Sequence, residues 1–322
     1  MRLQLTYAGG IYDRNQALYD GRVQPEGLEL NWLLLGYDEI WRRMLNHYDF
    51  DVSELSLSSY LIAKTSGRRL IAIPVFPARA FRHSFIFINT NSGISDPSDL
   101  NGKRVAVPDF EKTAAVWMKG ILQQQYGVSL EKIHWFTWSK TPRMDLQFYK
   151  SYSIHHIPAG KEPDQMLISG EIDAIIAPED PITRSVLRAT NVRRLFPNYK
   201  ETEVAYYQKT GIFPIMHTVA IREDLYNQHP WVAVSLFKAF QKAKELNYQT
   251  LNKPNPYPLS LIWFRDCLNE QTETLGSDPW PYGLERNRHT VETLMGYLVE
   301  QGLISKKCSL EELFARNTLT LE

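Results

Sequence analysis

A polar corner follows an expected strand in the stretch from Asp49 to Tyr60, DFDVSELSLSSY. Phe50 and Val52 alternate with two aspartates there, which is the period of a half-buried strand. The corner that follows is rich in carboxylate and hydroxyl groups, namely Glu54, Ser56, Ser58 and Ser59. Ser58 or Ser59 can cap a following helix, and exposed N–H groups at a helix start, flanked by hydroxyls, favour an anion. A Ser-rich turn with an ordinary helix cap is the alternative, because most Ser caps bind no ligand.

An arginine and two histidines elsewhere could handle carboxylates and protons. Arg82 and His83 are adjacent in the segment FRHS, and His217 lies within the expected strand PIMHTVAIR. Arginine can hold a carboxylate through two parallel hydrogen bonds, and the pKa of histidine suits proton donation near neutrality. Each residue also has a structural interpretation, since Arg82 could pair with a structural carboxylate and either histidine could be buried and hydrogen-bonded. The residue types alone leave both interpretations open.

The composition argues against several classes of protein. Among the 322 residues, 36 Lys plus Arg balance 36 Asp plus Glu, so the charge gives no reason to expect nucleic acid or an anionic membrane as a partner. Cys267 and Cys308 stand in no CxxC or Cys/His pattern, so neither a zinc site nor a disulfide framework is expected. The first residues, MRLQLTYAGGIYDR, lack the apolar core of a signal peptide, and a cytoplasmic location is therefore expected.

The order of the expected elements predicts an α/β fold. Besides the strand at Asp49, strands are expected at Leu3–Tyr7, Leu28–Leu35, Leu70–Val75 and Ser84–Thr90. Asp38 can cap a helix before the Asp49 strand. After the turn-rich segment Asn91–Gly102, strands alternate with helices, one of them beginning at Thr113, which is typical of a parallel sheet. From Pro230 onward the chain is mostly helical, and Ser309–Glu312 fits a capping box.

These elements form two strand-rich blocks and a helical C-terminal tail. We expect residues 1–89 and 220–322 to form one discontinuous lobe, residues 90–219 to form a second, and two strands to link them around a ligand cleft. Ligands in such sheets bind at the carboxyl ends of strands, near helix starts. The Ser56–Ser59 corner and Thr113 both fall at such ends. A bound anion is expected between that corner and Arg82.

Many sequence segments, in one order over nearly the whole chain, carry a family resemblance. They include YDR (Tyr12–Arg14), GRVQPEGLEL, DVSELSLSSY, FRHS, RLFPNYKE, GIFPIMHT, HPWVAVSLFKAF and YGLERNR. Together they resemble the 4,5-dihydroxyphthalate decarboxylase family. The resemblance implies the two-lobe fold of type 2 periplasmic binding proteins, a lyase activity and no organic cofactor. The stretch Thr137–Ala159 departs from the family's pattern, which leaves the exact substrate open.

The implied reaction sets clear demands on a site. Direct loss of CO2 from an aromatic ring would leave an unstable aryl carbanion. Protonation of the ring carbon that bears the carboxylate, helped by a para hydroxyl, allows CO2 to leave from a tetrahedral carbon. Such a site needs anchors for carboxylates, a general acid near that carbon and an acceptor for the phenol proton.

With the resemblance in hand, candidate residues can be assigned to these tasks. His83 is the leading general acid, His217 is an alternate acid or a partner of the phenol, and Glu54 could orient a histidine or accept the phenol proton; for Glu54 a structural salt bridge is the alternative. The expected substrate-binding residues are Arg14, Ser56, Ser58, Ser59, Arg82, Ser84 and Thr113. No metal site is expected, because His155 and His156 are adjacent on a strand and would face opposite ways.

Two other functions stay open at this point. A solute-binding protein of the same fold would need anchors for an anionic aromatic ligand but no proton donor, and it would normally carry an export signal or a lipid-modified cysteine. An enzyme of the same fold with different chemistry is a further alternative, because of the divergent stretch Thr137–Ala159. A homo-oligomer is compatible with the sequence, which does not settle the oligomeric state.

Overall fold

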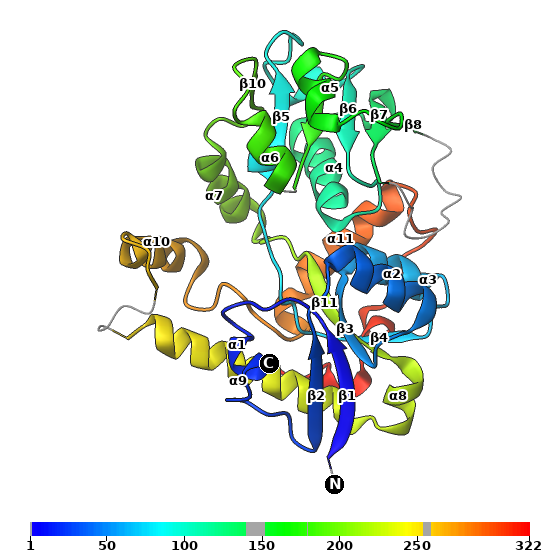
Figure 1. Cartoon of the computed structure of the whole chain (residues 1–322), viewed down its shortest axis with the longest axis vertical. Coiled ribbons are helices and arrows are strands. Elements are labelled where there is room, and N and C mark those ends of the chain that lie inside the picture. The colour runs from blue at the N-terminus through cyan, green and yellow to red at the C-terminus, as the bar shows by residue number, and fades with distance from the viewer. Residues whose placement is uncertain (1, 140–151, 179, 254–258) are drawn as a thin grey trace. The chain divides into compact units, whose positions relative to one another are not determined.

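The computed structural model describes residues 2–139, 152–178, 180–253 and 259–322 (Figure 1). The chain divides into two compact units. Unit 1 comprises Met1–Arg79, Ile215–Glu292 and Cys308–Glu322, and unit 2 comprises Ala80–Pro214 and Thr293–Lys307. Within the described residues, no helix combines the length and the apolar character that crossing a membrane would require.

Unit 1 is built on a five-stranded mixed sheet with the strand order β2-β1-β3-β11-β4. Its strands are β1 (Leu3–Ala8), β2 (Leu28–Leu33), β3 (Val52–Ser56), β4 (Leu70–Ile73) and β11 (His217–Arg222). β1 runs parallel to β2 and β3, whereas β11 runs antiparallel to β3 and β4. The last strand therefore returns from unit 2 into the middle of a sheet formed by the first part of the chain.

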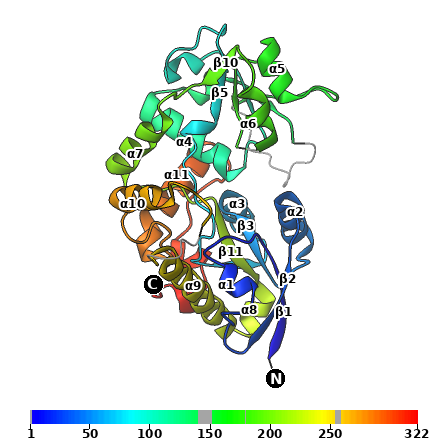
Figure 2. The ribbon, with the colours of Figure 1, turned by 60° about the vertical axis from the view of Figure 1, so that its left-hand side comes forward.

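Helices surround this sheet. They are α1 (Gln16–Tyr19), α2 (Tyr37–His47), α3 (Leu57–Thr65), α8 (Glu223–Gln228), α9 (Trp231–Leu251), α10 (Phe264–Leu275), the start of α11 (Arg288–Glu300) and α12 (Leu310–Leu313). α1 lies against the long helix α9, as both views show (Figures 1 and 2). α2 packs on β3, and α3 contacts both β3 and β11, so these two helices support the strands that carry the polar corner.

The caps of α2 and α3 differ from those predicted. Asp38 lies in the first turn of α2, whose N-cap is Gly36. Ser56 is the N-cap of α3 and makes no capping hydrogen bond with its side chain, so the predicted cap at Ser58 or Ser59 is wrong. The reason is that strand β3 runs directly into the helix, which starts at Leu57 without a separate turn. The predicted capping box of Ser309 with Glu312 is confirmed.

Unit 2 has a six-stranded mixed sheet with the order β10-β5-β9-β6-β7-β8. Its strands are β5 (Ile86–Asn89), β6 (Arg104–Val107), β7 (His134–Thr137), β8 (Ser153–His156), β9 (Ala174–Ile176) and β10 (Val192–Arg194). The helices are α4 (Thr113–Tyr126), α5 (Pro163–Ser169), α6 (Asp180–Val186) and α7 (Tyr199–Thr210). α5 and α6 lie side by side over a core that includes Phe87, Leu167 and Ile175 (Figure 2).

The start of α4 at Thr113 is as predicted, but the chain enters β5 later than expected. A single turn of 3₁₀ helix, His83–Phe85, precedes that strand. The C-terminal part of α11 also belongs to unit 2. There the ring of Tyr297 fits against Gly120, where a Cβ would lie 2.2 Å from the ring, and Gln301 donates to the carbonyl of Val116. The chain consequently passes between the units four times, not twice.

Candidate active site

Glu54 lies at the centre of a cluster of hydrogen bonds in unit 1. It belongs to β3, whose residues are all buried, and its own side chain is fully shielded from solvent. Its Oε2 accepts the N–H of Gly10 at 2.9 Å, and its Oε1 accepts the hydroxyl of Tyr12 at 2.6 Å. The same Oε1 lies 2.5 Å from Nδ1 of His217. Burying a carboxylate without hydrogen-bond partners would destabilise the folded chain. These donors offset that cost and stabilise Glu54 in its buried position.

The pairing of β3 with β11 brings Glu54 and His217 to one face of the sheet. The two strands are antiparallel, with His217 opposite Ser56 and Val219 opposite Glu54. Residues two apart on a strand share a face, so Glu54, Ser56 and His217 project from the same side. Diagonal neighbours on paired strands are within reach of long side chains, which accounts for the contact between the carboxylate and the imidazole.

The ring of His217 is held in one orientation. Its centroid lies 5.1 Å from the ring of Tyr37 and 5.1 Å from that of Trp41. An ionised carboxylate only accepts hydrogen bonds, so Nδ1 of His217 carries the proton in its contact with Glu54. Nε2 is then the nitrogen that can exchange a proton with a ligand, and the side chain is 14% exposed. A carboxylate that holds an imidazole in this way suits general acid–base catalysis.

Two phenols extend the hydrogen-bond chain beyond Glu54. The hydroxyl of Tyr12 donates to Glu54 and makes a short contact with the hydroxyl of Tyr37. Since Tyr12 directs its single proton to Glu54, Tyr37 is the donor in that second contact. Burial, reinforced by the charge of Glu54, raises the pKa of Tyr12 above its usual range and that of Tyr37 to about 12. Both phenols are therefore protonated at neutral pH.

Gly10 is required next to these phenols. A Cβ at this position would lie 2.1 Å from the hydroxyl oxygen of Tyr37, so any larger residue would collide with Tyr37 and displace it. The glycine thus lets the backbone N–H approach Glu54 while Tyr37 stays in place. The pair Gly9-Gly10, which follows the end of β1 at Ala8, is part of the site and is the sequence signal that could have pointed to Tyr12 and Tyr37.

Arg14 lies beside Tyr12 and is fixed by several contacts. Its guanidinium carbon is 4.3 Å from the centre of the Tyr12 ring and 4.6 Å from that of the Trp280 ring. Its Nε donates to the carbonyl of Pro77 at 2.7 Å, and Nη1 lies 3.1 Å from a carboxylate oxygen of Asp13. Nη2 donates to the same Pro77 carbonyl, so the contacts within the described residues engage three of the five N–H groups and leave one on each terminal nitrogen for a carboxylate ligand.

The three serines of the polar corner are buried and contact one another. The hydroxyl of Ser59 donates to that of Ser56 at 3.1 Å, and the hydroxyls of Ser56 and Ser58 lie 3.4 Å apart. Of the three, Ser56 is placed best to reach a ligand near His217, because the two residues are direct partners across β3 and β11. The corner is therefore a buried hydroxyl cluster next to the histidine, not an open turn.

His83 lies in unit 2, where it is fully buried among aromatic rings. The centroid of its ring is 5.2 Å from that of Phe196 and 5.5 Å from that of Tyr206. Burial lowers the pKa of His83 to about 4, so the imidazole is neutral at pH 7. Its Nδ1 lies 3.9 Å from a carboxylate oxygen of Glu203, and neither ring nitrogen has a hydrogen-bond partner in the described part of the chain.

Arg82, Ser84 and Thr113 also belong to unit 2. Burial lowers the pKa of Arg82 to about 10, and its guanidinium stacks on Phe85 with 5.1 Å between them. The backbone N–H of Ser84 lies 3.3 Å from Glu203, whose own pKa burial raises to about 7. Thr113 is the first residue of α4 and is buried. The structure thus groups Arg82, His83 and Ser84 with Glu203, a residue that the sequence did not single out.

His155 and His156, the adjacent histidines on β8, each contact a neighbouring hydroxyl group. His155 contacts the hydroxyl of Ser153 and His156 that of Thr137, each at 3.0 Å. Over the described ranges, no three His, Cys, Asp or Glu side chains are grouped closely enough to hold a metal ion. Of the divergent stretch Thr137–Ala159, residues 140–151 lie outside the described residues.

Comparison with solved structures identifies the fold. The chain aligns with the periplasmic aliphatic sulphonate binding protein SsuA from Escherichia coli at a TM-score of 0.57 and 14% identity, over 99% of both chains. It aligns with the desulfurization enzyme DSZB at a TM-score of 0.50 and 15% identity, again over 99% of both. Identities this low show a shared fold alone, and they confirm the predicted α/β fold of the periplasmic-binding-protein type.

Comparison with curated proteins identifies the family, although no family model matches the chain. A 4,5-dihydroxyphthalate decarboxylase of Pseudomonas putida is 38% identical over 186 residues, which cover 56% of this chain and 72% of that protein. A second protein of that name, from Comamonas testosteroni, is 35% identical over 319 residues, covering 97% of this chain and 96% of that protein. The resemblance seen in the sequence segments is thereby confirmed, and the chain belongs to the 4,5-dihydroxyphthalate decarboxylase family.

Proposed function

We propose that the protein is a carboxy-lyase that converts 4,5-dihydroxyphthalate to 3,4-dihydroxybenzoate and CO2. Membership of the family supports the substrate. The observation that carries the chemistry is the contact of 2.5 Å between the buried carboxylate of Glu54 and Nδ1 of the partly exposed His217. This pair supplies what a ligand-binding site alone would not need, an imidazole that a buried carboxylate holds in one orientation.

The reaction begins with proton transfer to the ring. The hydroxyl at ring carbon 4 is para to the carboxylate at carbon 1, so loss of its proton pushes electron density onto carbon 1. Nε2–H of the His217 imidazolium delivers a proton to that carbon, which becomes tetrahedral. The bond to the carboxylate then breaks, CO2 leaves, and the bonding pair returns to the ring as aromaticity is restored. The oxygen at carbon 4 takes back from solvent the proton that it lost to solvent, and a second solvent proton recharges His217, so that over one cycle one proton has replaced one CO2.

Glu54 and the phenols prepare His217 for this step. The carboxylate selects the tautomer with a proton on Nδ1 and stabilises the imidazolium before transfer. Tyr12 and Tyr37 hold the carboxylate in place and keep their own protons. Arg14 is the proposed anchor for a carboxylate in unit 1, and Ser56 the proposed hydroxyl partner. The prediction that a substrate carboxylate is bound also includes three residues of unit 2, namely Arg82, Ser84 and Thr113.

His83 is a weaker proposal for the acid than the sequence implied. An acid must hold a proton near neutral pH, whereas burial holds the pKa of His83 at about 4. A dianionic ligand beside the ring would raise that pKa, and this is the condition under which His83 would take the role. His217, by contrast, is partly exposed and already contacts the carboxylate of Glu54.

An anion-binding protein is the second candidate function. It is favoured by the fold, which the chain shares with a sulphonate-binding protein. A binding protein would retain an anionic aromatic compound without releasing CO2. The same fold also occurs in the desulfurization enzyme DSZB, so the architecture does not decide between binding and catalysis.

The deciding experiment offers 4,5-dihydroxyphthalate, 4-hydroxyphthalate and unsubstituted phthalate to the purified protein and measures CO2. We expect release from the hydroxylated compounds and none from phthalate, which lacks the electron-donating hydroxyl. In D2O the product should carry one deuterium at the carbon that lost CO2. Tight binding of all three compounds without CO2 would favour the anion-binding function instead.

A further inference from the structure

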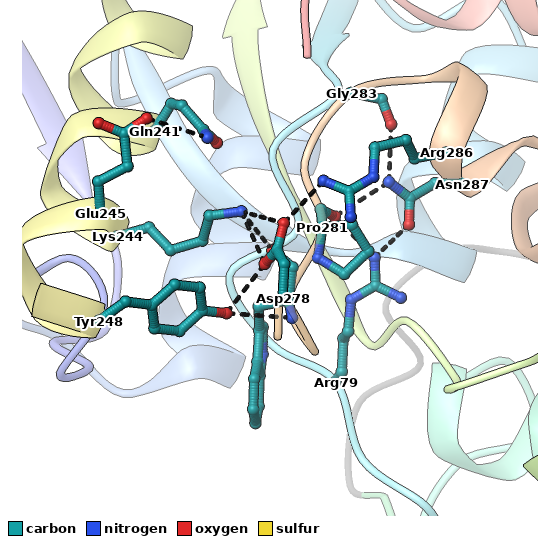
Figure 3. A network of polar contacts seen from close by, with 11 residues as sticks. Arg79, Gln241, Lys244, Glu245, Tyr248, Asp278, Pro281, Gly283, Arg286 and Asn287 are labelled. Carbon is teal, nitrogen blue, oxygen red and sulfur yellow. Dashed lines mark hydrogen bonds and ion pairs between the residues drawn. The ribbon is translucent and has the colours of Figure 1, made fainter. Parts of the chain in front are cut away.

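A polar network in unit 1 converges on Asp278, which follows α10. Its carboxylate accepts hydrogen bonds from Lys244 at 3.0 and 3.1 Å, from Arg286 at 2.7 Å and from the hydroxyl of Tyr248 at 3.0 Å (Figure 3). Burial alone would raise the pKa of Asp278, but the charge of Lys244 and these hydrogen bonds hold it below its usual value. Lys244 is almost completely buried, so the pair is a fixed element and not a mobile surface contact.

The network also holds the backbone that follows Asp278. Lys244 donates to the carbonyl of Trp280 at 2.8 Å, and the N–H of Trp280 reaches the hydroxyl of Tyr248 at 3.3 Å. Arg79 donates to the carbonyl of Pro281 at 2.9 Å, and Figure 3 shows Arg79, Pro281 and Asn287 close together. Both the N–H and the carbonyl of Trp280 are therefore hydrogen-bonded. The prolines on either side of Trp280, Pro279 and Pro281, restrict the backbone further.

The ring of Trp280 is the part of this segment that reaches the candidate active site. Its centre lies 4.6 Å from the guanidinium carbon of Arg14, and the same carbon lies 4.3 Å from the centre of the Tyr12 ring. Tyr12 in turn donates to Glu54. A continuous series of contacts thus runs from Asp278 through Trp280 and Arg14 to the carboxylate that holds His217.

Arg14 has space into which it could move if Trp280 were smaller. Arg14, Tyr248 and Trp280 line a cavity of about 200 Å³ between α9 and α10. An arginine side chain has many rotamers of similar energy, and the contacts with the two rings add to the hydrogen bond with Pro77 in fixing one of them. The Trp280 ring supplies one of these contacts and lines the cavity together with Arg14.

We propose that Trp280 and Asp278 are positioning residues that fix Arg14 for binding a substrate carboxylate. The inference rests on the role given to Arg14 in the proposed function. Asp278 acts on Arg14 only through Trp280, and Trp280 acts only on the orientation of the guanidinium. Loss of this orientation should weaken binding of the carboxylate in the ground state and in the transition state alike, which raises KM with little change in kcat.

The test is a double-mutant cycle on the affinity for phthalate, measured by titration calorimetry. The proteins are the wild type, Trp280→Leu, Arg14→Met and the variant with both changes. We expect Trp280→Leu to weaken phthalate binding by about tenfold, the scale of a charge-assisted hydrogen bond. In the Arg14→Met background the same change should have an effect below about twofold, because there is no guanidinium left to position.

Two further variants separate positioning from folding. Trp280→Phe keeps an aromatic face and should restore most of the affinity, whereas Trp231→Leu removes a tryptophan that is 43% exposed on α9 and should leave it unchanged. If Trp280→Leu does not fold, Tyr248→Phe tests the same segment, since it removes the hydroxyl that contacts both Asp278 and the Trp280 N–H. Tyr248→Phe should raise KM for 4,5-dihydroxyphthalate more than it changes kcat.

Several results would overturn the proposal. Equal losses from Trp280→Leu with and without Arg14 would show that the tryptophan acts by another route. Failure of the wild type to bind phthalate would remove the carboxylate anchor altogether. Failure of the proposed function is a separate outcome, in which phthalate binds and the cycle can be measured but 4,5-dihydroxyphthalate releases no CO2.

Discussion

Nδ1 of His217 lies 2.5 Å from Oε1 of Glu54, and the carboxylate is fully buried while the imidazole is partly exposed. The buried carboxylate fixes the tautomer and the orientation of the ring. The exposed edge leaves Nε2 able to meet a ligand. This difference in exposure between two residues in direct contact suits a donor that must hold a proton and then release it to a bound molecule.

The carboxylate of Glu54 should be essential although it does not touch the substrate. Glu54→Gln keeps the size of the side chain but removes the charge that stabilises the imidazolium. We expect kcat to fall by about a hundredfold or more, with a smaller change in KM, since the effect falls on the proton-transfer step. Steady-state kinetics with 4,5-dihydroxyphthalate measure both constants. Glu39→Gln, on the surface of α2, is the control, and a Glu54→Gln enzyme within threefold of the wild type would refute the role.

Gly10→Ala should disturb the phenols next to Glu54. Its Cβ would collide with the hydroxyl of Tyr37, so we expect a loss of about 1–3 kcal/mol in the free energy of unfolding and a fall in kcat. Tyr37→Phe in the same chain should recover part of the stability, because it removes the colliding atom. Gly36→Ala, where no atom lies within 4 Å of the added Cβ, is the matched control. Equal unfolding midpoints in urea for both glycine variants would contradict the predicted collision.

The raised pKa of Glu203, in unit 2, should make the free energy of unfolding depend on pH. Burial raises its pKa to about 7 in the folded chain, from an ordinary value of 4.5. Between these values the folded chain retains a proton that the unfolded chain has released, so this residue lowers the free energy of unfolding as the pH rises. Glu203→Gln removes the titration. Urea unfolding should therefore show the variant gaining stability relative to the wild type between about pH 5 and about pH 8.

His83 does not disturb that comparison. Burial lowers its pKa, so its own contribution has the opposite sign and is lost as the pH falls through the range between its ordinary and folded values. Because both proteins contain His83, this contribution largely cancels in the difference. Glu201→Gln, an exposed change on the same helix, serves as the control. A difference between wild type and Glu203→Gln that stays constant with pH would argue against a buried, protonated Glu203.

The sequence predicted correctly those helix starts whose capping or first residues lie close together in the chain. The start of α4 at Thr113 and the capping box of Ser309 follow from residues within one turn of each other. The family likewise followed from segments read in order. The cap of α3 was missed because β3 passes into α3 without a turn, and spacing alone does not reveal that junction. The cap of α2 was placed two residues late, at Asp38 instead of Gly36.

The site is formed by residues that lie far apart in the sequence, and the spacing of residues does not show which of them meet. Tyr12 and Glu54 are 42 residues apart, and Glu54 and His217 are 163 apart. The sequence named Glu54 and His217 as candidates, but only strand pairing placed them together. Burial of His83 was one of two interpretations that the sequence left open, and the rings that pack around it lie far along the chain, on α4 and α7.

Single-turnover decarboxylation of 4,5-dihydroxyphthalate by histidine variants is the most direct measurement. The wild type is compared with His217→Asn, His83→Asn and the exposed control His47→Asn, and the release of 3,4-dihydroxybenzoate is followed. We expect His217→Asn to slow release by about a hundredfold or more with the affinity for phthalate nearly unchanged, and the other two variants to stay within about tenfold of the wild type. An unimpaired His217→Asn enzyme together with an inactive His83→Asn enzyme would contradict the assignment and transfer the role of acid to His83.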